Sequence, residues 1–144
     1  MINILSGIDS TSSALNAERI RMDVVSQNIA NVNTSRGANG KPYARQQVVF
    51  ESVLKDHLGG SHPPGTAPME VVIPRIETDK RPPRLVYQPG HPNANANGMV
   101  AVPDINMYEE MIDLTSASRA YEANLGVLKT ARTMALHTLG IGKR

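Results

Sequence analysis

The chain lacks cysteine and tryptophan, and it has few aromatic residues of any kind. Without cysteine, disulfides, thiolate metal sites and thiol catalysis are excluded. Aromatic residues make up only 3% of the 144 residues, although a small autonomous core usually takes much of its buried area from large side chains. This scarcity indicates that part of the apolar surface is buried against other chains.

Long apolar runs and blocks of like charge are missing as well. No stretch approaches the roughly 20 apolar residues that a membrane-spanning helix needs, and the first residues lack the pattern of a cleaved secretory signal. The net charge is +2, with no run of five or six like charges. We therefore expect neither nucleic-acid binding nor an integral membrane protein.

The usual patterns of catalytic and metal sites do not occur. The four histidines form no helical His-x-x-x-His pair, and there is no phosphate-binding glycine loop and no Gly-x-Ser-x-Gly elbow. Glu109, Glu110 and Asp113 lie close together, but at the start of a predicted helix, where the helix dipole favours acidic side chains. We expect no enzyme, no catalytic residue, no metal and no cofactor.

Residues 6–32 are free of proline and carry a seven-residue apolar repeat, which is typical of a narrow coiled-coil seam. Ser6 and Asp9 resemble a capping box that would start the helix, and the turn-forming residues 31–34 should end it. The seam residues that we expect to carry assembly are Ile8, Leu15, Met22, Val25 and Ile29.

Residues 104–140 carry the same repeat in two rows. Asn106 with Glu109 predicts a capping box at the start, and the helix would be about 50 Å long. One row comprises Met107, Leu114, Tyr121, Leu128 and Ala135, and the other Met111, Ser118, Leu125, Arg132 and Leu139. From these rows, Met111, Leu114, Tyr121, Leu125, Leu128 and Leu139 complete the expected assembly interface.

Most prolines and the strand-like runs lie between the two helices. The predicted strands are Tyr43–Phe50, Met69–Ile73 and Leu85–Tyr87, and surface loops are expected at 59–65 and 89–98. The predicted fold is mainly α with a small β-rich middle. Its parts are an N-terminal helix (1–35), a β-rich and loop segment (36–103) and a C-terminal helix (104–144), with the helices paired as a coiled coil.

Either helix alone should be unstable, because ordering its backbone costs more than its few seam side chains return on burial. The two seams could bury one another in an antiparallel or a parallel pair. Even then outer apolar residues such as Ile20, Val24 and Val127 would stay exposed. The sequence therefore predicts a protein that assembles with neighbouring chains.

Specific segments add a resemblance to this pattern. Arg21–Thr34 resembles the N-terminal signature of flagellar rod and hook proteins, a helix that ends in asparagine-rich turns. Met111–Leu125 resembles the C-terminal helix of the same family, and the middle segments 42–50, 87–92 and 98–106 are similar to its proximal-rod members. The motif residues are Asn28, Asn31, Asn33, Ser118, Arg119, Tyr121 and Asn124.

The resemblance implies a non-catalytic structural subunit of the flagellar basal body. Such subunits leave the cytoplasm through the flagellar type III export apparatus and polymerise in the periplasmic rod through their terminal helices. The implied partners are the rod proteins FlgB, FlgF and FlgG, the adaptor FliE, and further copies of the chain. A dimeric coiled-coil adaptor or chaperone in the cytosol is the alternative.

Overall fold

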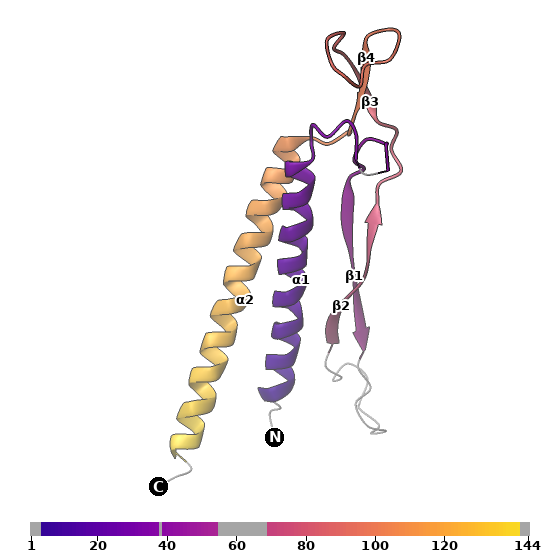
Figure 1. The fold of residues 1–144 in the computed structure, drawn as a ribbon. Coiled ribbons are helices and arrows are strands. Elements are labelled where there is room, and N and C mark those ends of the chain that lie inside the picture. The colour runs from indigo at the N-terminus through magenta and orange to yellow at the C-terminus, as the bar shows by residue number, and fades with distance from the viewer. Residues whose placement is uncertain (1–3, 38, 55–68, 142–144) are drawn as a thin grey trace. The chain divides into compact units, whose positions relative to one another are not determined.

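The computed structural model describes residues 4–37, 39–54 and 69–141. As predicted, it is mainly helical with a small β region between two terminal helices (Figure 1). The strands form two separate two-stranded sheets, β1–β2 and β3–β4. The elements in chain order are α1 (Ile4–Ala30), β1 (Gln46–Leu54), β2 (Met69–Thr78), β3 (Arg84–Tyr87), β4 (Met99–Val102) and α2 (Met107–Ile141).

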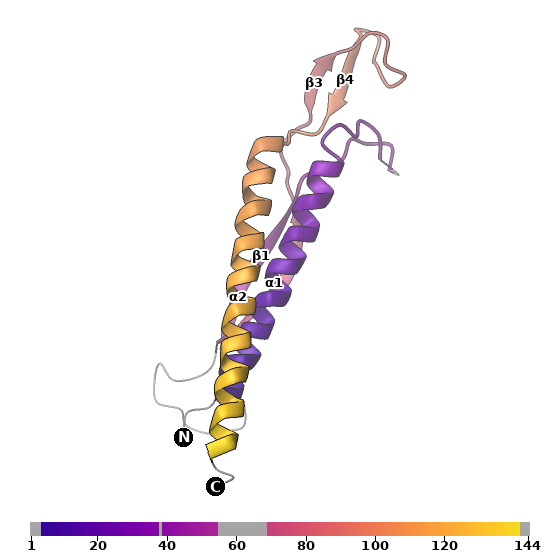
Figure 2. The same cartoon turned by 90° about the vertical axis from the view of Figure 1, so that its left-hand side faces the viewer.

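The two helices pack against each other in an antiparallel pair. Arg21 forms an ion pair with Asp113, while Asn28, two turns later in α1, bonds to Glu110, which comes earlier in α2. Chain directions are therefore opposed, as the ribbons show (Figures 1 and 2). The sequence pattern had allowed either direction.

The helix ends follow local capping chemistry, with one exception. Asn106 caps α2: its Oδ1 accepts a hydrogen bond from the Tyr108 amide (3.1 Å) and its Nδ2 donates to Glu109 Oε1 (3.0 Å). Asn106 is therefore the helix cap, as predicted, but Glu109 bonds to its side-chain amide and not to its backbone amide, as a full capping box would require. The prediction that α1 begins at Ser6 was wrong, because helical structure already starts at Ile4 and leaves Ser6 inside the helix. The expected end holds, since α1 stops at Ala30.

The chain divides into two compact units, each of which takes part of both helices. One unit contains residues 1–20, 49–75 and 117–144, and the other contains 21–48 and 76–116. Among the described residues, the buried apolar side chains are small or β-branched: Ala17 and Ala117 in the first unit, and Val24, Val25, Val100 and Ile105 in the second. Such a core fits the low aromatic content.

The strands differ in detail from the sequence prediction. β1 begins three residues later than expected, because Gln46 is the first residue of the 43–50 run to enter the ladder. β2 continues through Pro74 to Thr78, which a two-stranded sheet permits because each strand has a free edge. β4 was not predicted; it pairs antiparallel with β3, with Arg84 opposite Val102 and Tyr87 opposite Met99. The 59–65 loop lies outside the described residues.

Gly98 closes the β3–β4 hairpin in a conformation that favours glycine. Its φ is +71°, its carbonyl accepts a hydrogen bond from the Gln88 amide (2.8 Å) and its amide donates to the Asn95 carbonyl (2.9 Å). A Cβ placed there would lie 3.0 Å from Tyr87 Cε2 and 3.2 Å from Pro89 Cβ. Both the backbone and the close packing therefore require glycine.

We expect Gly98→Ala to lower the free energy of unfolding by about 1–2 kcal/mol, the cost of a left-handed conformation for a residue with a Cβ. Urea unfolding of the purified variant measures the change. Gly90→Ala is the matched control on the same hairpin, because Gly90 has open space around it and no positive φ. Equal stability of the two variants would contradict this account of the turn.

Candidate functional site

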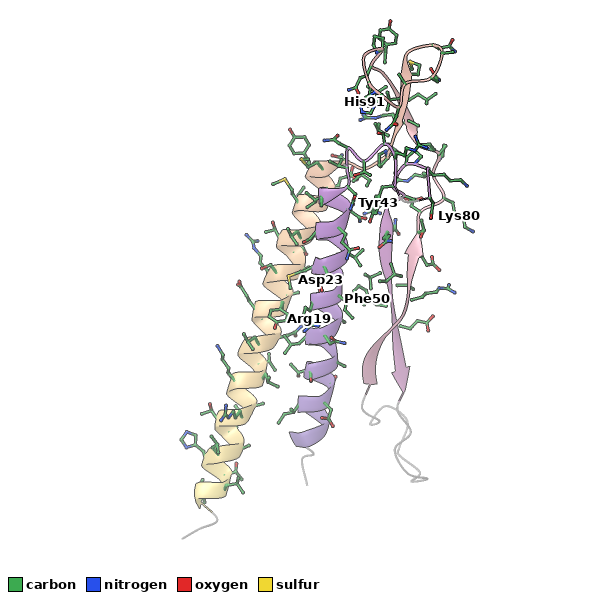
Figure 3. All side chains as sticks on the ribbon, in the orientation of Figure 1. Arg19, Asp23, Tyr43, Phe50, Lys80 and His91 are labelled. Carbon is green, nitrogen blue, oxygen red and sulfur yellow. The ribbon has the colours of Figure 1, made fainter. Side chains whose placement is uncertain are left out.

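A hydrogen-bonded cluster of polar side chains joins the last turn of α1, the segment that leads into β1 and the first turn of α2. Figure 3 labels Tyr43 beside the C-terminal end of α1. Asn28 and Glu110 are each only 1% exposed. Burial of this kind requires that every polar group finds a partner. We refer to Asn28, Tyr43, Arg45, Gln46 and Glu110 as the clasp.

Asn28 uses all of its hydrogen-bonding capacity in the clasp. Its Nδ2 donates to the Gln46 carbonyl (2.9 Å) and to Glu110 Oε2 (3.0 Å). Its Oδ1 accepts from the Gln46 amide (3.0 Å) and from the Tyr43 hydroxyl (2.9 Å). A primary amide has two donors and two acceptor positions, so the side chain pairs with the backbone of Gln46 much as a neighbouring strand would. Aspartate lacks the two donors.

Glu110 is a buried carboxylate whose two oxygens are both bonded. Oε1 accepts a short hydrogen bond from Arg45 Nε (2.6 Å), and Oε2 accepts from Asn28. The Arg45 carbonyl in turn accepts from the Asp79 amide at the end of β2 (2.7 Å). A buried charge is tolerated when a charged donor and further hydrogen bonds compensate it. The clasp thus fixes α1, the start of β1 and the start of α2 against one another.

The asparagine-rich turn after α1 explains a second motif residue. Asn31 Nδ2 donates to the Gln27 carbonyl (2.9 Å), which also accepts from the Asn31 amide (3.1 Å), so Asn31 bonds twice to the last turn of α1. Thr34 Oγ1 donates to Asn31 Oδ1 (3.1 Å), and the Thr34 amide donates to the Asn31 carbonyl (3.0 Å). The side chain of Asn33 is exposed. Asn31 therefore holds the local turn and Asn28 the clasp, whereas Asn33 faces solvent.

The Tyr43 hydroxyl gives the clasp a dependence on pH. Burial, and secondly the negative charge of Glu110, raise the pKa of Tyr43 above its usual value of 10.0. The phenol is therefore protonated more readily in the folded state than in the unfolded state. The stability that this contributes is complete below pH 10.0 and is lost as the pH rises through the raised pKa.

We expect the unfolding midpoint of the chain to fall when the pH is raised above 10, and Tyr43→Phe to flatten that fall. The phenolate could not donate a hydrogen bond to Asn28 Oδ1, and its negative charge would repel that of Glu110. Thermal unfolding between pH 8 and 11 gives the comparison. Tyr108→Phe serves as control, because Tyr108 is exposed; if both variants flattened the profile equally, Tyr43 would not be responsible.

The sequence reasoning found Asn28 through the family resemblance but did not connect it with Tyr43, Arg45 or Glu110. One signal was present: Glu110 stands four and seven residues before the predicted helix positions Leu114 and Ala117, on what proves to be the inner face. A carboxylate that is surrounded by small or apolar residues at helical spacing indicates a buried, paired charge.

The structure shows which face of α2 turns toward the rest of the chain. In the first predicted row, Leu114, Tyr121, Leu128 and Ala135 are half-buried, as a seam should be, whereas Met107 is exposed. The neighbouring inner positions are Glu110, Ala117, Asn124 and Ala131, one residue earlier than the second predicted row. In that predicted row, Ser118 and Leu125 are half-buried, whereas Met111 and Leu139 are exposed. Small residues replace large ones on the inner face because they allow the helices to approach closely.

The remaining predicted residues lie mainly at intermediate depth. Val25 of α1 is buried, and Ile8, Leu15, Met22 and Ile29 are half-buried. In the α2 motif, Tyr121 and Asn124 are half-buried like Ser118, while Arg119 is exposed. Their role in assembly stays a prediction.

Large apolar side chains also line the outside of α2. The described residues of α2 with exposed apolar side chains are Met107, Tyr108, Met111, Ile112, Val127, Met134, Leu136, Leu139 and Ile141. Exposed apolar surface on this scale marks an interaction site in a soluble protein. Among the described residues, neither helix is long and apolar enough to cross a membrane.

Comparisons with known proteins identify a family region at each end of the chain. Residues 8–36 match the family described as flagella basal body rod protein, and residues 96–141 match the flagellar basal body rod FlgEFG protein C-terminal family. Flagellar basal-body rod protein FlgC of Borreliella burgdorferi is 38% identical, covering 97% of this chain and 98% of that protein. The FlgC of Salmonella typhimurium has the same identity and coverage, and that of Bacillus subtilis is 40% identical over 94% of this chain and 96% of its own length.

The chain belongs to the FlgC family of flagellar basal-body rod proteins. FlgC membership confirms the resemblance of the two terminal segments and places the chain among the structural components of the rod. The two matched regions contain the two central residues of the clasp, Asn28 and Glu110. The clasp therefore joins the N-terminal and C-terminal family regions directly.

Proposed function

We propose that the chain is a non-catalytic subunit of the proximal rod that polymerises through its terminal helices. The exposed apolar side chains of α2 carry this proposal, because an isolated chain leaves them in water and neighbouring helices would cover them. Segments 1–35 and 104–144 would form the helical core of the polymer. Segment 36–103 would make lateral contacts.

The clasp supports this division of roles. It ties the first residues of the middle segment to both helices through Asn28 and Glu110. A mechanical load on the middle segment would then pass into the helical core through the hydrogen bonds of the clasp. A structural subunit of a rotating rod needs this kind of connection.

The scarcity of large core residues is compatible with passage through the flagellar type III export apparatus as an unfolded chain. A marginal core unfolds easily and gains stability when partners cover its surface. We propose FlgB, FlgF and FlgG as rod neighbours, FliE as the adaptor, and further copies of the chain as lateral partners, all assembled in the periplasm.

Fractionation of cells that carry a tagged chain tests this function. The expected result is tagged chain in purified basal bodies, resistant to washing with salt, because buried apolar contacts are not screened by ions. A free helical dimer found in the cytosol and never in basal bodies would support the adaptor function and overturn the rod assignment.

A further inference from the structure

The β3–β4 hairpin exposes one apolar face. Side chains alternate along a strand: Val86 lies opposite the buried Val100, whereas Leu85 and Tyr87 point to the other side. Leu85 is 58% and Tyr87 68% exposed. Two exposed basic side chains precede the patch in the chain: Arg84 at the start of β3, and Lys80, which Figure 3 labels on the segment that leads into it. We call Leu85 and Tyr87 the hairpin patch.

The start of α2, in the same unit of the chain, exposes a second apolar face. Tyr108 is 79% and Ile112 70% exposed. These two residues are four positions apart and so lie on one side of the helix, away from the buried Glu110. Two exposed acidic side chains stand beside them in the sequence: Glu109, and Asp104, whose carboxylate also lies 3.4 Å from Arg81 Nη1 of the same chain. We call Tyr108 and Ile112 the helix-start patch.

We propose that the hairpin patch of one copy packs on the helix-start patch of a second copy. The two faces are apolar and are flanked by charges of opposite sign, basic Lys80 and Arg84 against acidic Asp104 and Glu109. Complementary charges at the rim of an apolar contact select the partner and set its orientation. The two patches differ, so the contact is heterologous and leaves one free patch of each kind for the next copy.

This inference rests on the proposed rod function, which requires contacts that continue from copy to copy. An isologous contact would close after two copies. A heterologous contact between the hairpin and the start of α2 adds a lateral link that is separate from helix packing in the core. It also gives the exposed hairpin a partner.

Cysteine cross-linking tests the contact cleanly, because the natural chain has no cysteine. A chain with Leu85→Cys and Ile112→Cys would be expressed in place of the natural one, and purified basal bodies treated with a bifunctional maleimide. We expect a ladder of covalent multimers rising by one subunit mass, and monomers from each single variant. The matched control combines Leu85→Cys with Glu122→Cys, exposed on α2 about 15 Å further along the helix, and should give no ladder.

Three results would overturn the contact: incorporation of the double variant without multimers, dimers from either single variant, or an equal ladder from the control pair. If the first pair blocks incorporation, Tyr87→Cys with Tyr108→Cys supplies the same comparison. Absence of the natural tagged chain from basal bodies would instead refute the rod function itself. The two failures are thus distinguished.

Discussion

Replacing Asn28 with alanine is expected to lower the free energy of unfolding by about 3 kcal/mol, one of the largest effects of any single substitution in this chain. The truncation leaves the backbone of Gln46 without its partner and removes one of the two donors that face Glu110. Asn28→Asp should be worse, because it places a second negative charge beside a buried carboxylate. Urea unfolding followed by circular dichroism gives both values.

Asn33→Ala is the matched control, since Asn33 lies in the turn just after α1 and belongs to the same family motif but is exposed. Its stability should stay within about 0.5 kcal/mol of the natural chain. If Asn28→Ala were equally mild, the clasp would not hold the helix ends, and the importance of Asn28 would have to come from contacts outside the chain.

The second large effect concerns assembly rather than folding. Leu136→Asp should abolish incorporation into the rod and swimming, while changing the stability of the isolated chain by no more than about 0.5 kcal/mol. Leu136 is exposed in the single chain, so a carboxylate there stays hydrated until a neighbour covers it. Burial without a partner then becomes unfavourable. Immunoblots of purified basal bodies and spreading in soft agar measure the two outcomes.

Thr133→Asp is the control for Leu136→Asp, because Thr133 is a polar, exposed residue one turn earlier on α2. This variant should assemble and swim. Full motility of the Leu136→Asp strain would show that no neighbour covers Leu136 in the rod. Loss of stability in the isolated chain would show instead that Leu136 supports the fold of the subunit.

The two helices and their ends were largely predictable because they depend on local signals. The seven-residue repeats, the Asn106 cap and the turn residues after Ala30 all act within a few positions of the chain. The start of α1 was misplaced because a capping pair at Ser6 and Asp9 fits the interior of a longer helix as well. Whether the two helices run parallel or antiparallel could not be predicted, because an apolar repeat allows either arrangement.

What the sequence could not reveal depends on contacts between distant residues. The predicted rows were chosen for their large apolar side chains. They therefore left out the buried positions Glu110 and Ala117, which lie one residue before Met111 and Ser118. The clasp joins Asn28 to residues 18 and 82 positions away, and no local rule connects them. The short β4 run went unrecognised because its pairing with β3 is what makes it a strand.

The central claim is that this chain is a structural component of the rod, and tomographic imaging of basal bodies in a strain without its gene tests it most directly. The account predicts membrane rings without a rod, together with lost motility that the intact gene restores. An intact rod and hook in the deletion strain would contradict it.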